Sequence, residues 1–257
     1  MLIVLSPAKT LDESRVRPPL PTTQPPLLGE AEKLVRTARN LSLKKLRALM
    51  HISEPLAKLN RDRFQAFETP LTPDNAVPAG YMFRGDVYRG LDIDTFSEED
   101  LAFAQDHLAI LSGLYGIVRP LDLVSPYRLE MGSSLKTRRG PNLYAFWGER
   151  ITKQIQSMTG EHEPRVLVNL ASQEYFRSVK VPKLGMRVVT PVFKELRKGK
   201  EITVSFTAKR SRGLMARWIV QNRMTSTDRF AEFDQLDYEF QPERSTEDTL
   251  LFVRPGP

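Results

Sequence analysis

Leu111–Gly132 reads LSGLYGIVRPLDLVSPYRLEMG, and its turn-forming residues prevent a regular helix or strand from running through it. Gly113 and Gly116 have two residues between them, and Pro120 follows shortly after. Ser97 is a suitable N-cap for a helix that would enter this stretch and stop at Gly113. A hairpin and a second helical turn from Pro120 would follow. The sequence therefore predicts a helix-hairpin-helix-like element.

This predicted element covers residues about 97–130. Its hairpin could direct backbone N–H groups at a phosphate, which makes Gly113, Gly116 and Arg119 candidate phosphate-binding residues. The sequence also allows a second interpretation, an ordinary connection from a helix to a loop. In that case three apolar side chains of the stretch pack into the core: Leu114, Ile117 and Val118.

The composition is that of a globular protein, with 257 residues of which 40% are hydrophobic. There is no cysteine, which excludes disulfides, cysteine-based metal sites and a cysteine nucleophile. No apolar run approaches the roughly 20 residues that span a bilayer, so we expect a cytoplasmic protein without a membrane partner. The histidines, at positions 51, 107 and 162, show no paired spacing. We therefore expect no metal site and no cofactor.

Charge is distributed in blocks along the chain, and the formal net charge is +7. Cations dominate between Arg177 and Lys200, and Lys209–Arg223 contains cations and no acid. Asp92–Asp106, by contrast, contains carboxylates and no cation. Such separation favours one strongly positive surface and a polyanionic or phosphorylated ligand. Solvated faces that merely alternate along the chain remain the other interpretation.

Two apolar runs, Leu2–Leu5 and Arg165–Ala171, are typical of buried strands. Polar residues follow each run, as they do in α/β proteins that bind ligands at the carboxyl end of a sheet. A third segment, Tyr81–Leu91, has the alternation of a strand with polar side chains on one face. Together these segments supply candidate substrate-site residues: Ser6, Thr10, Arg84, Asp86, Tyr88, Asn169, Ser172 and Tyr175.

Lys209–Arg223 is predicted to be a helix that begins with cations and continues with an apolar stripe. Because its N-terminus would combine the helix dipole with side-chain charge, this is the strongest predicted anion-binding feature of the chain. Strands are expected at Met186–Phe193 and Glu201–Thr207, and one amphipathic helix from Pro141 to Met158.

The order of these elements indicates an α/β fold, with a mixed sheet surrounded by helices. We expect a single domain over residues 1–257, with a helical excursion at about 29–67. The proline-rich residues 15–26 are expected to form an extended surface segment.

Several long motifs resemble those of the bacterial YaaA family, the peroxide-stress resistance proteins. They are SPAKTLD (6–12), FRGDVYRGL (83–91), NLYAFWGERIT (142–152), VLVNLASQEYFRSV (166–179) and KRSRGLMARWIVQNR (209–223). The resemblance implies a single α/β domain with a positively charged cleft and a helix-hairpin-helix-like element. It also implies DNA binding and a role in limiting oxidative damage by lowering free intracellular iron.

The first functional hypothesis is a protein that holds duplex or branched DNA by phosphate contacts, with little sequence specificity. Its predicted DNA-binding or phosphate-binding residues are Lys9, Gly113, Gly116, Arg119, Arg128, Lys180, Lys194, Lys209, Arg210, Arg212 and Arg217.

The alternative is an enzyme that acts on a nucleotide or another phosphorylated small molecule in the same cleft. In this hypothesis Lys9 binds phosphate, and Asp86 or Glu130 serves as the general base. The sequence shows no recognisable pair of nucleophile and base, so it assigns no catalytic residue.

Overall fold

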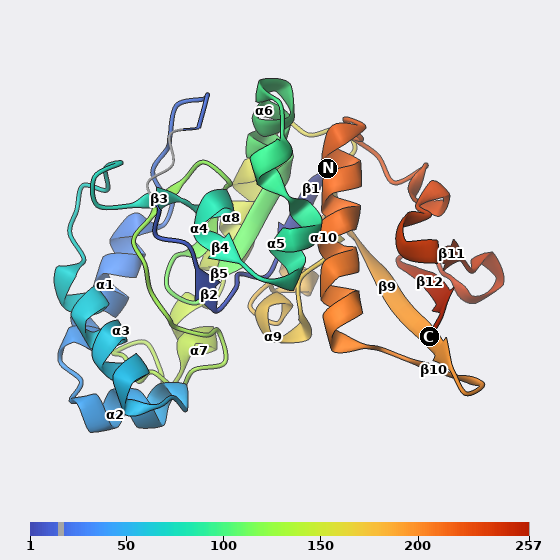
Figure 1. Ribbon diagram of the computed structural model, residues 1–257. Helices are drawn as coiled ribbons and strands as arrows, with labels where there is room; N and C mark the ends of the chain where they lie inside the picture. The colour runs from blue at the N-terminus through green and yellow to red at the C-terminus, as the bar shows by residue number, and fades with distance from the viewer. Residues whose placement is uncertain (15–17, 257) are drawn as a thin grey trace.

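The computed structural model describes residues 1–14 and 18–256 (Figure 1). The start of the proline-rich segment, residues 15–17, lies outside this part of the chain. Within it, the main sheet has eight strands in the order β11-β12-β9-β8-β1-β5-β6, with β10 paired to β9. Their bounds are β1 (Leu2–Leu5), β5 (Leu108–Ser112), β6 (Gly116–Val118), β8 (Val166–Asn169), β9 (Arg187–Arg197), β10 (Lys200–Ile202), β11 (Glu239–Phe240) and β12 (Thr249–Pro255).

The centre of this sheet is parallel, from β12 through β9, β8 and β1 to β5. Strands β6, β10 and β11 are antiparallel to their neighbours, so the sheet is mixed. Ile3 of β1 pairs with Leu108 on one side and Val168 on the other. The whole of β1 is buried, which explains its continuous apolar sequence. The carboxyl ends of β1 and β8 therefore lie side by side at one edge of the sheet.

Helices surround the sheet, and their bounds are α1 (Leu28–Arg39), α2 (Leu43–Met50), α3 (Glu54–Ala66), α4 (Ala79–Met82), α5 (Asp86–Leu91), α6 (Glu98–His107), α7 (Leu143–Trp147), α8 (Arg150–Met158), α9 (Gln173–Phe176) and α10 (Ser205–Gln221). Two small strand pairs join β2 (Thr10–Leu11) to β4 (Phe83–Arg84) and β3 (Val77–Pro78) to β7 (Leu123–Val124). The 3-10 turns are η1 (Ile93–Thr95), η2 (Val181–Lys183), η3 (Phe230–Glu232), η4 (Gln235–Asp237) and η5 (Pro242–Arg244).

These elements form one α/β domain, as the sequence predicted. Helices α1, α2 and α3 gather at one end of the sheet (Figure 1), where the helical excursion was expected. Helices α5, α6 and α10 lie together against one face, and α5 and α10 make close contact. In residues 1–14 and 18–256, no helix combines the length and apolarity needed to cross a bilayer.

The prediction of a helix-hairpin-helix-like element is wrong, because the described chain forms one helix followed by a β-hairpin in this region. Helix α6 begins at the predicted N-cap Ser97 but ends at His107, and β5 and β6 then form an antiparallel hairpin. Leu108–Ser112 is buried on both faces beside β1, and such a strand has the same apolar sequence as a buried helix turn. No helical turn follows Pro120. The alternative interpretation was right about the core, because three side chains of the hairpin are fully buried: Leu114, Ile117 and Val118.

Three other predicted elements differ from the structure. Tyr81–Leu91 is not one strand but α4, β4 and α5, because Gly85 takes a φ of 134° and lets α5 begin at the next residue. The predicted helix that ends at Met158 is divided into α7 and α8 at Gly148, which has a φ of 53°. The strand predicted over Glu201–Thr207 stops at Ile202, and α10 begins at Ser205.

Glu30, in the first turn of α1, links this helix to the segment that contains Arg139. Its carboxylate accepts hydrogen bonds from Arg139 and from Lys33, the latter at 2.7 Å. The Arg139 hydrogen bond, helped by Lys33, lowers the pKa of Glu30 from 4.5 to about 2. A carboxyl group with a lowered pKa stabilises the fold above its unfolded pKa, and this contribution disappears as the pH falls through the folded value.

We expect Glu30→Gln to lower the free energy of unfolding by about 1 kcal/mol at pH 7. The two proteins should become equally stable as the pH falls from 4.5 towards about 2, where Glu30 is protonated. Urea denaturation at a series of pH values measures this difference. Glu68→Gln changes an exposed glutamate and serves as the control. A Glu30→Gln effect that does not change with pH would contradict the prediction.

Candidate anion-binding cleft

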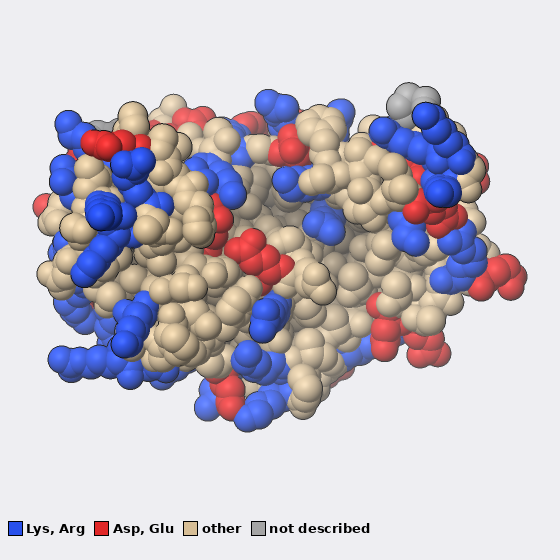
Figure 2. All heavy atoms as spheres, turned by 90° about the horizontal axis from the view of Figure 1, so that it is seen from below, with Lys and Arg blue, Asp and Glu red and all other residues tan. Residues whose placement is uncertain are grey.

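A cleft of about 440 Å³ opens where β1 and β8 end side by side. The two chain segments are joined there by Ser6 and Ser172. The backbone N–H of Ser172 donates to Ser6 Oγ at 2.8 Å, and Ser6 Oγ lies 3.2 Å from Ser172 Oγ. Figure 2 views the molecule from below Figure 1, towards the ends of these strands, and shows a hollow with charged side chains around it. Polar groups that follow the two strands thus meet at this edge.

Tyrosine side chains make up much of the buried wall of the cleft. Tyr88 of α5 donates its hydroxyl to the backbone oxygen of Ser6 at 3.0 Å, which ties α5 to the end of β1. Tyr127 and Tyr175 also line the cleft, and all three rings are buried. Burial raises the pKa of each of these tyrosines. Their hydroxyl groups therefore remain neutral and act as hydrogen-bonding groups, not as bases.

Arg84 reaches the cleft because β2 and β4 pair Thr10 with Arg84. Its guanidinium group lies 3.3 Å from a carboxylate oxygen of Asp12 and 2.8 Å from one of Asp94. Asp86, at the start of α5, contributes a carboxylate, which lies 3.9 Å from Arg89. On this side of the cleft, the positive charges of the arginines are therefore offset by nearby carboxylates.

A carboxylate between two cations forms the next part of the lining. Glu130 Oε1 lies 3.0 Å from Lys9 Nζ and 3.2 Å from an Arg128 guanidinium nitrogen. Lys9 is 64% exposed, whereas the Arg128 side chain is only 19% exposed. Arg128 Nε is buried without a hydrogen-bond partner among the described residues. Both cations thus retain donors that a ligand could use.

Two cations of α10, Lys209 and Arg212, line the cleft without a counter-charge from the described chain. Lys209 and Arg212 are three residues apart, so they project from the same side of the helix into the cleft. Neither makes a hydrogen bond or ion pair with residues 1–14 or 18–256. Burial, with no compensating acid, lowers the pKa of Arg212. An anion bound here would supply the missing partner.

The structure brings most of the predicted residues together. Those that line the cleft are Ser6, Lys9, Thr10, Arg84, Asp86, Tyr88, Arg128, Glu130, Ser172, Tyr175, Lys209 and Arg212. Among the charged residues of the lining, cations outnumber acids, whose carboxylates belong to Asp86, Glu130 and Glu174. Glu174 is one of the polar residues that the sequence placed after the second strand, whereas Tyr127 was not among the predicted residues.

Other predicted residues lie outside the cleft, and several of their side chains have partners of their own. Asn169 accepts a hydrogen bond from the backbone N–H of Ala171 at 3.1 Å and so shapes the end of β8. The remaining side-chain contacts are Arg119 with Asp122 at 4.0 Å, Lys194 with Glu201 at 3.7 Å, and Arg217 with Asp92 at 3.1 Å. The backbone N–H of Lys180 donates to Thr152 Oγ1 at 2.8 Å, and Arg210 is exposed.

Gly113 and Gly116 do not form a phosphate-binding hairpin. Both are buried, and a Cβ at Gly113 would collide with the backbone of Leu129. Gly116 has a φ of 76° and lies under the ring of Trp147. The two glycines therefore allow close packing of the core, and no phosphate can approach them.

Lys209 does not lie at the N-terminus of α10, where the sequence predicted it. Because α10 begins at Ser205, Lys209 and Arg212 lie beyond its first turn, away from the free N–H groups of the terminus. Their contribution to anion binding is the charge and hydrogen bonding of the side chains.

Comparisons with known proteins agree with this architecture. The family model described as "Peroxide stress protein YaaA" matches residues 1–244. A UPF0246 protein of Roseobacter denitrificans is 49% identical over 260 residues, which cover 100% of this chain and 99% of that protein. The chain therefore belongs to the family of the peroxide stress protein YaaA.

Proposed function

We propose that this protein acts in the cytoplasm during peroxide stress by binding DNA, with phosphate groups held at the cleft. The observation that carries the proposal is the pair of cations, Lys209 and Arg212, that line the cleft without an acidic partner among the described residues. Leaving a half-buried guanidinium group unpaired costs free energy in the free protein. A phosphate oxygen would offset that cost with charge-assisted hydrogen bonds.

The form of the cleft suggests how DNA would lie. A volume of about 440 Å³ accommodates a ligand of nucleotide size but not a duplex. A duplex or a branched junction would therefore lie across the opening and direct phosphates inwards. Phosphate contacts of this kind position DNA without reading its bases, so little sequence specificity is expected.

Phosphate binding would also connect the protein to damage by iron. Iron(II) that gathers at DNA phosphates converts peroxide into hydroxyl radicals beside the sugar. A protein that neutralises phosphates releases the cations held there, so it would move iron away from the DNA. We propose that the protein limits iron-dependent damage in this way. Nicking of supercoiled plasmid by iron(II) and peroxide should decrease when the protein is present at saturating concentration.

The salt dependence of DNA binding tests the proposal. Each neutralised phosphate contributes about −0.9 to the slope of log K against log salt, so Lys209 and Arg212 together account for about −1.8. Lys209→Ala should weaken binding to unrelated duplexes alike and make the slope shallower by about 1. Lys200→Ala, an exposed lysine of the β10 turn, should leave the slope unchanged. Affinity that does not depend on salt would refute the proposal.

A second function is favoured by the strand-end position of the cleft, which is typical of enzymes that bind nucleotides. In this alternative Lys9 would bind a phosphate, and Asp86 would act as the general base. Glu130 is less suited to that role because it pairs with two cations. Thermal unfolding with mononucleotides at concentrations well above Kd separates the two functions. Stabilisation by a mononucleotide but not by DNA would favour the enzyme.

A further inference from the structure

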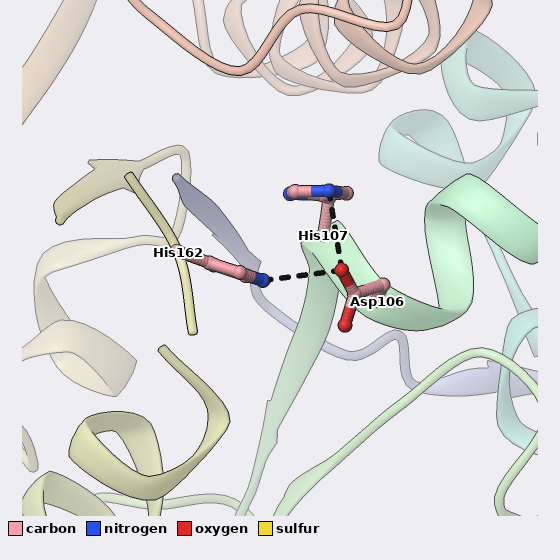
Figure 3. Close-up of side chains that lie close together, drawn as sticks. All are labelled: Asp106, His107 and His162. Atoms are coloured by element: carbon pink, nitrogen blue, oxygen red, sulfur yellow. Dashed lines mark hydrogen bonds and ion pairs between the residues drawn. The ribbon is translucent and has the colours of Figure 1, made fainter. Parts of the chain in front are cut away.

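A second group of side chains, Asp106, His107 and His162, lies close together (Figure 3). They stand near the amino ends of the strands whose carboxyl ends border the cleft. Asp106 and His107 end α6, just before β5, and His162 stands on the segment between α8 and β8. Because β1 lies between β5 and β8, the amino ends of these strands meet beside Met1. The fold thus brings together two histidines that are 55 positions apart in the sequence.

Asp106 lies at ligand-to-ligand distance from both histidines of this group. Asp106 Oδ2 lies 3.2 Å from Nε2 of His107 and 3.2 Å from Nε2 of His162. The three ligand atoms all lie within 4.8 Å of one another. Two donors on one tetrahedral zinc ion are separated by about 3.4 Å, given metal-to-ligand distances near 2.1 Å. Among the described residues, this is the group of at least three His, Asp or Glu side chains that could hold an ion.

The hydrogen bond on the other side of His107 determines which nitrogen faces Asp106. Nδ1 lies 2.7 Å from the backbone oxygen of Met1, and a carbonyl oxygen can only accept. His107 therefore carries a proton on Nδ1, and in the neutral ring Nε2 presents a lone pair to a carboxylate oxygen. Two electron pairs opposed at 3.2 Å repel each other, so either a proton on Nε2 or a metal ion must lie between these two atoms. A backbone oxygen that fixes Nδ1–H is also the usual outer partner of a metal-binding histidine.

The two imidazole rings indicate which side chain must adjust when an ion binds. The rings are stacked, with centroids 4.5 Å apart and 18° between their planes, so one ion cannot lie in both planes. His107 is held by Met1 and by stacking on Phe103 at 4.1 Å. His162 Nδ1, by contrast, is buried without a partner among the described residues. We therefore expect the ring of His162, and not that of His107, to rotate when an ion binds.

We propose that Asp106, His107 and His162 bind a divalent transition-metal ion of the zinc type. Imidazole nitrogens with one carboxylate oxygen are the donors that such ions prefer, whereas Mg²⁺ and Ca²⁺ prefer oxygen alone. Asp106 is 63% exposed, so an ion can reach the site from solvent and keep water on its remaining positions. This site is separate from the cleft and does not depend on the function proposed there.

Calorimetric titration of the full-length protein with Zn²⁺ tests the proposal. One equivalent should bind, and Asp106→Asn should weaken the affinity at least about tenfold by replacing the charged ligand. This variant keeps the shape of an exposed side chain, so we expect it to fold. Co²⁺ provides a second measurement, because tetrahedral binding by these nitrogens gives visible absorption that Asp106→Asn should reduce.

His51→Asn is the matched control, since it removes the remaining histidine of the chain at an exposed position. It should leave Zn²⁺ affinity and Co²⁺ absorption unchanged. Binding that survives Asp106→Asn but is lost in His51→Asn would overturn the proposal. So would the absence of Zn²⁺ binding at pH 7.5, which would identify the group as two histidines that share a proton with Asp106.

Discussion

Gly213→Ala is expected to lower the free energy of unfolding by at least about 3 kcal/mol. Gly213 lies where α10 crosses α5 at backbone contact. A Cβ at this position would lie 2.8 Å from the backbone nitrogen of Leu91 and would overlap the carbonyl oxygen of Val87. Gly90 faces the same contact from α5, where a Cβ would lie 2.8 Å from the nitrogen of Leu214. Because the obstacles are backbone atoms, the helices would have to separate.

Urea denaturation followed by circular dichroism measures this effect, and Gly29→Ala is its control. Gly29 lies in the first turn of α1, and a Cβ there meets nothing within 4 Å. Alanine favours a helix over glycine by about 1 kcal/mol, so this variant should be as stable as the parent or slightly more stable. If Gly213→Ala behaved in the same way, the backbone contact would not exist as described.

The same crossing sets the width of the cleft. Helix α5 contributes Tyr88 to one wall, and α10 contributes Lys209 and Arg212 to another. A separation of the two helices moves these walls apart. We therefore expect whatever fraction of Gly213→Ala folds to bind DNA more weakly than the parent, although no charge has been removed.

The part of the fold that the sequence predicted correctly is the part determined by local patterns. The apolar runs at β1 and β8 are long enough to indicate buried parallel strands, and polar residues directly follow them. Parallel neighbours end at one edge, but the two runs alone did not show that β1 and β8 are neighbours and that Ser6 meets Ser172. The helices α1, α2 and α3 were likewise predictable from caps and apolar spacing.

The hairpin of β5 and β6 could not be predicted in the same way. Leu108 and Leu111 satisfy the spacing of a helix face, and the same residues belong equally well to a strand buried on both faces. The choice depends on β1, which pairs with β5 and is more than 100 positions away in the sequence. Non-local pairing also explains why His107 and His162, distant in sequence, were not predicted to meet.

The prediction of the cleft residues was incomplete for a similar reason. Charge blocks along the chain show where cations are frequent but not which of them have partners. Arg217 belongs to the predicted cluster, yet its guanidinium group binds Asp92 and the hydroxyl of Thr95, the latter at 2.6 Å. Arg212, five positions earlier, has no such partner among the described residues. Only the three-dimensional arrangement separates a structural cation from one available to a ligand.

Arg212→Ala is therefore expected to change stability and binding in opposite directions. The guanidinium group loses hydration in the cleft and gains no acidic partner from the described chain, which is why burial lowers its pKa. Removing it should raise the free energy of unfolding by about 1 kcal/mol. Affinity for DNA should fall at least about tenfold, because charge-assisted hydrogen bonds to phosphate are lost. Denaturation and fluorescence anisotropy measure the two effects on the same protein.

Two further variants test whether the gain in stability and the loss of DNA affinity both depend on the position of Arg212 in the cleft. Arg210→Ala removes an equal charge from an exposed position of α10 outside the cleft, so stability and affinity should both stay near the parent values. Arg212→Lys keeps the charge but loses the planar set of donors, and it should recover only part of the affinity. A protein in which Arg212→Ala binds DNA as tightly as the parent does not use this cleft for phosphate. If the variant is also less stable, Arg212 serves the fold and not the ligand.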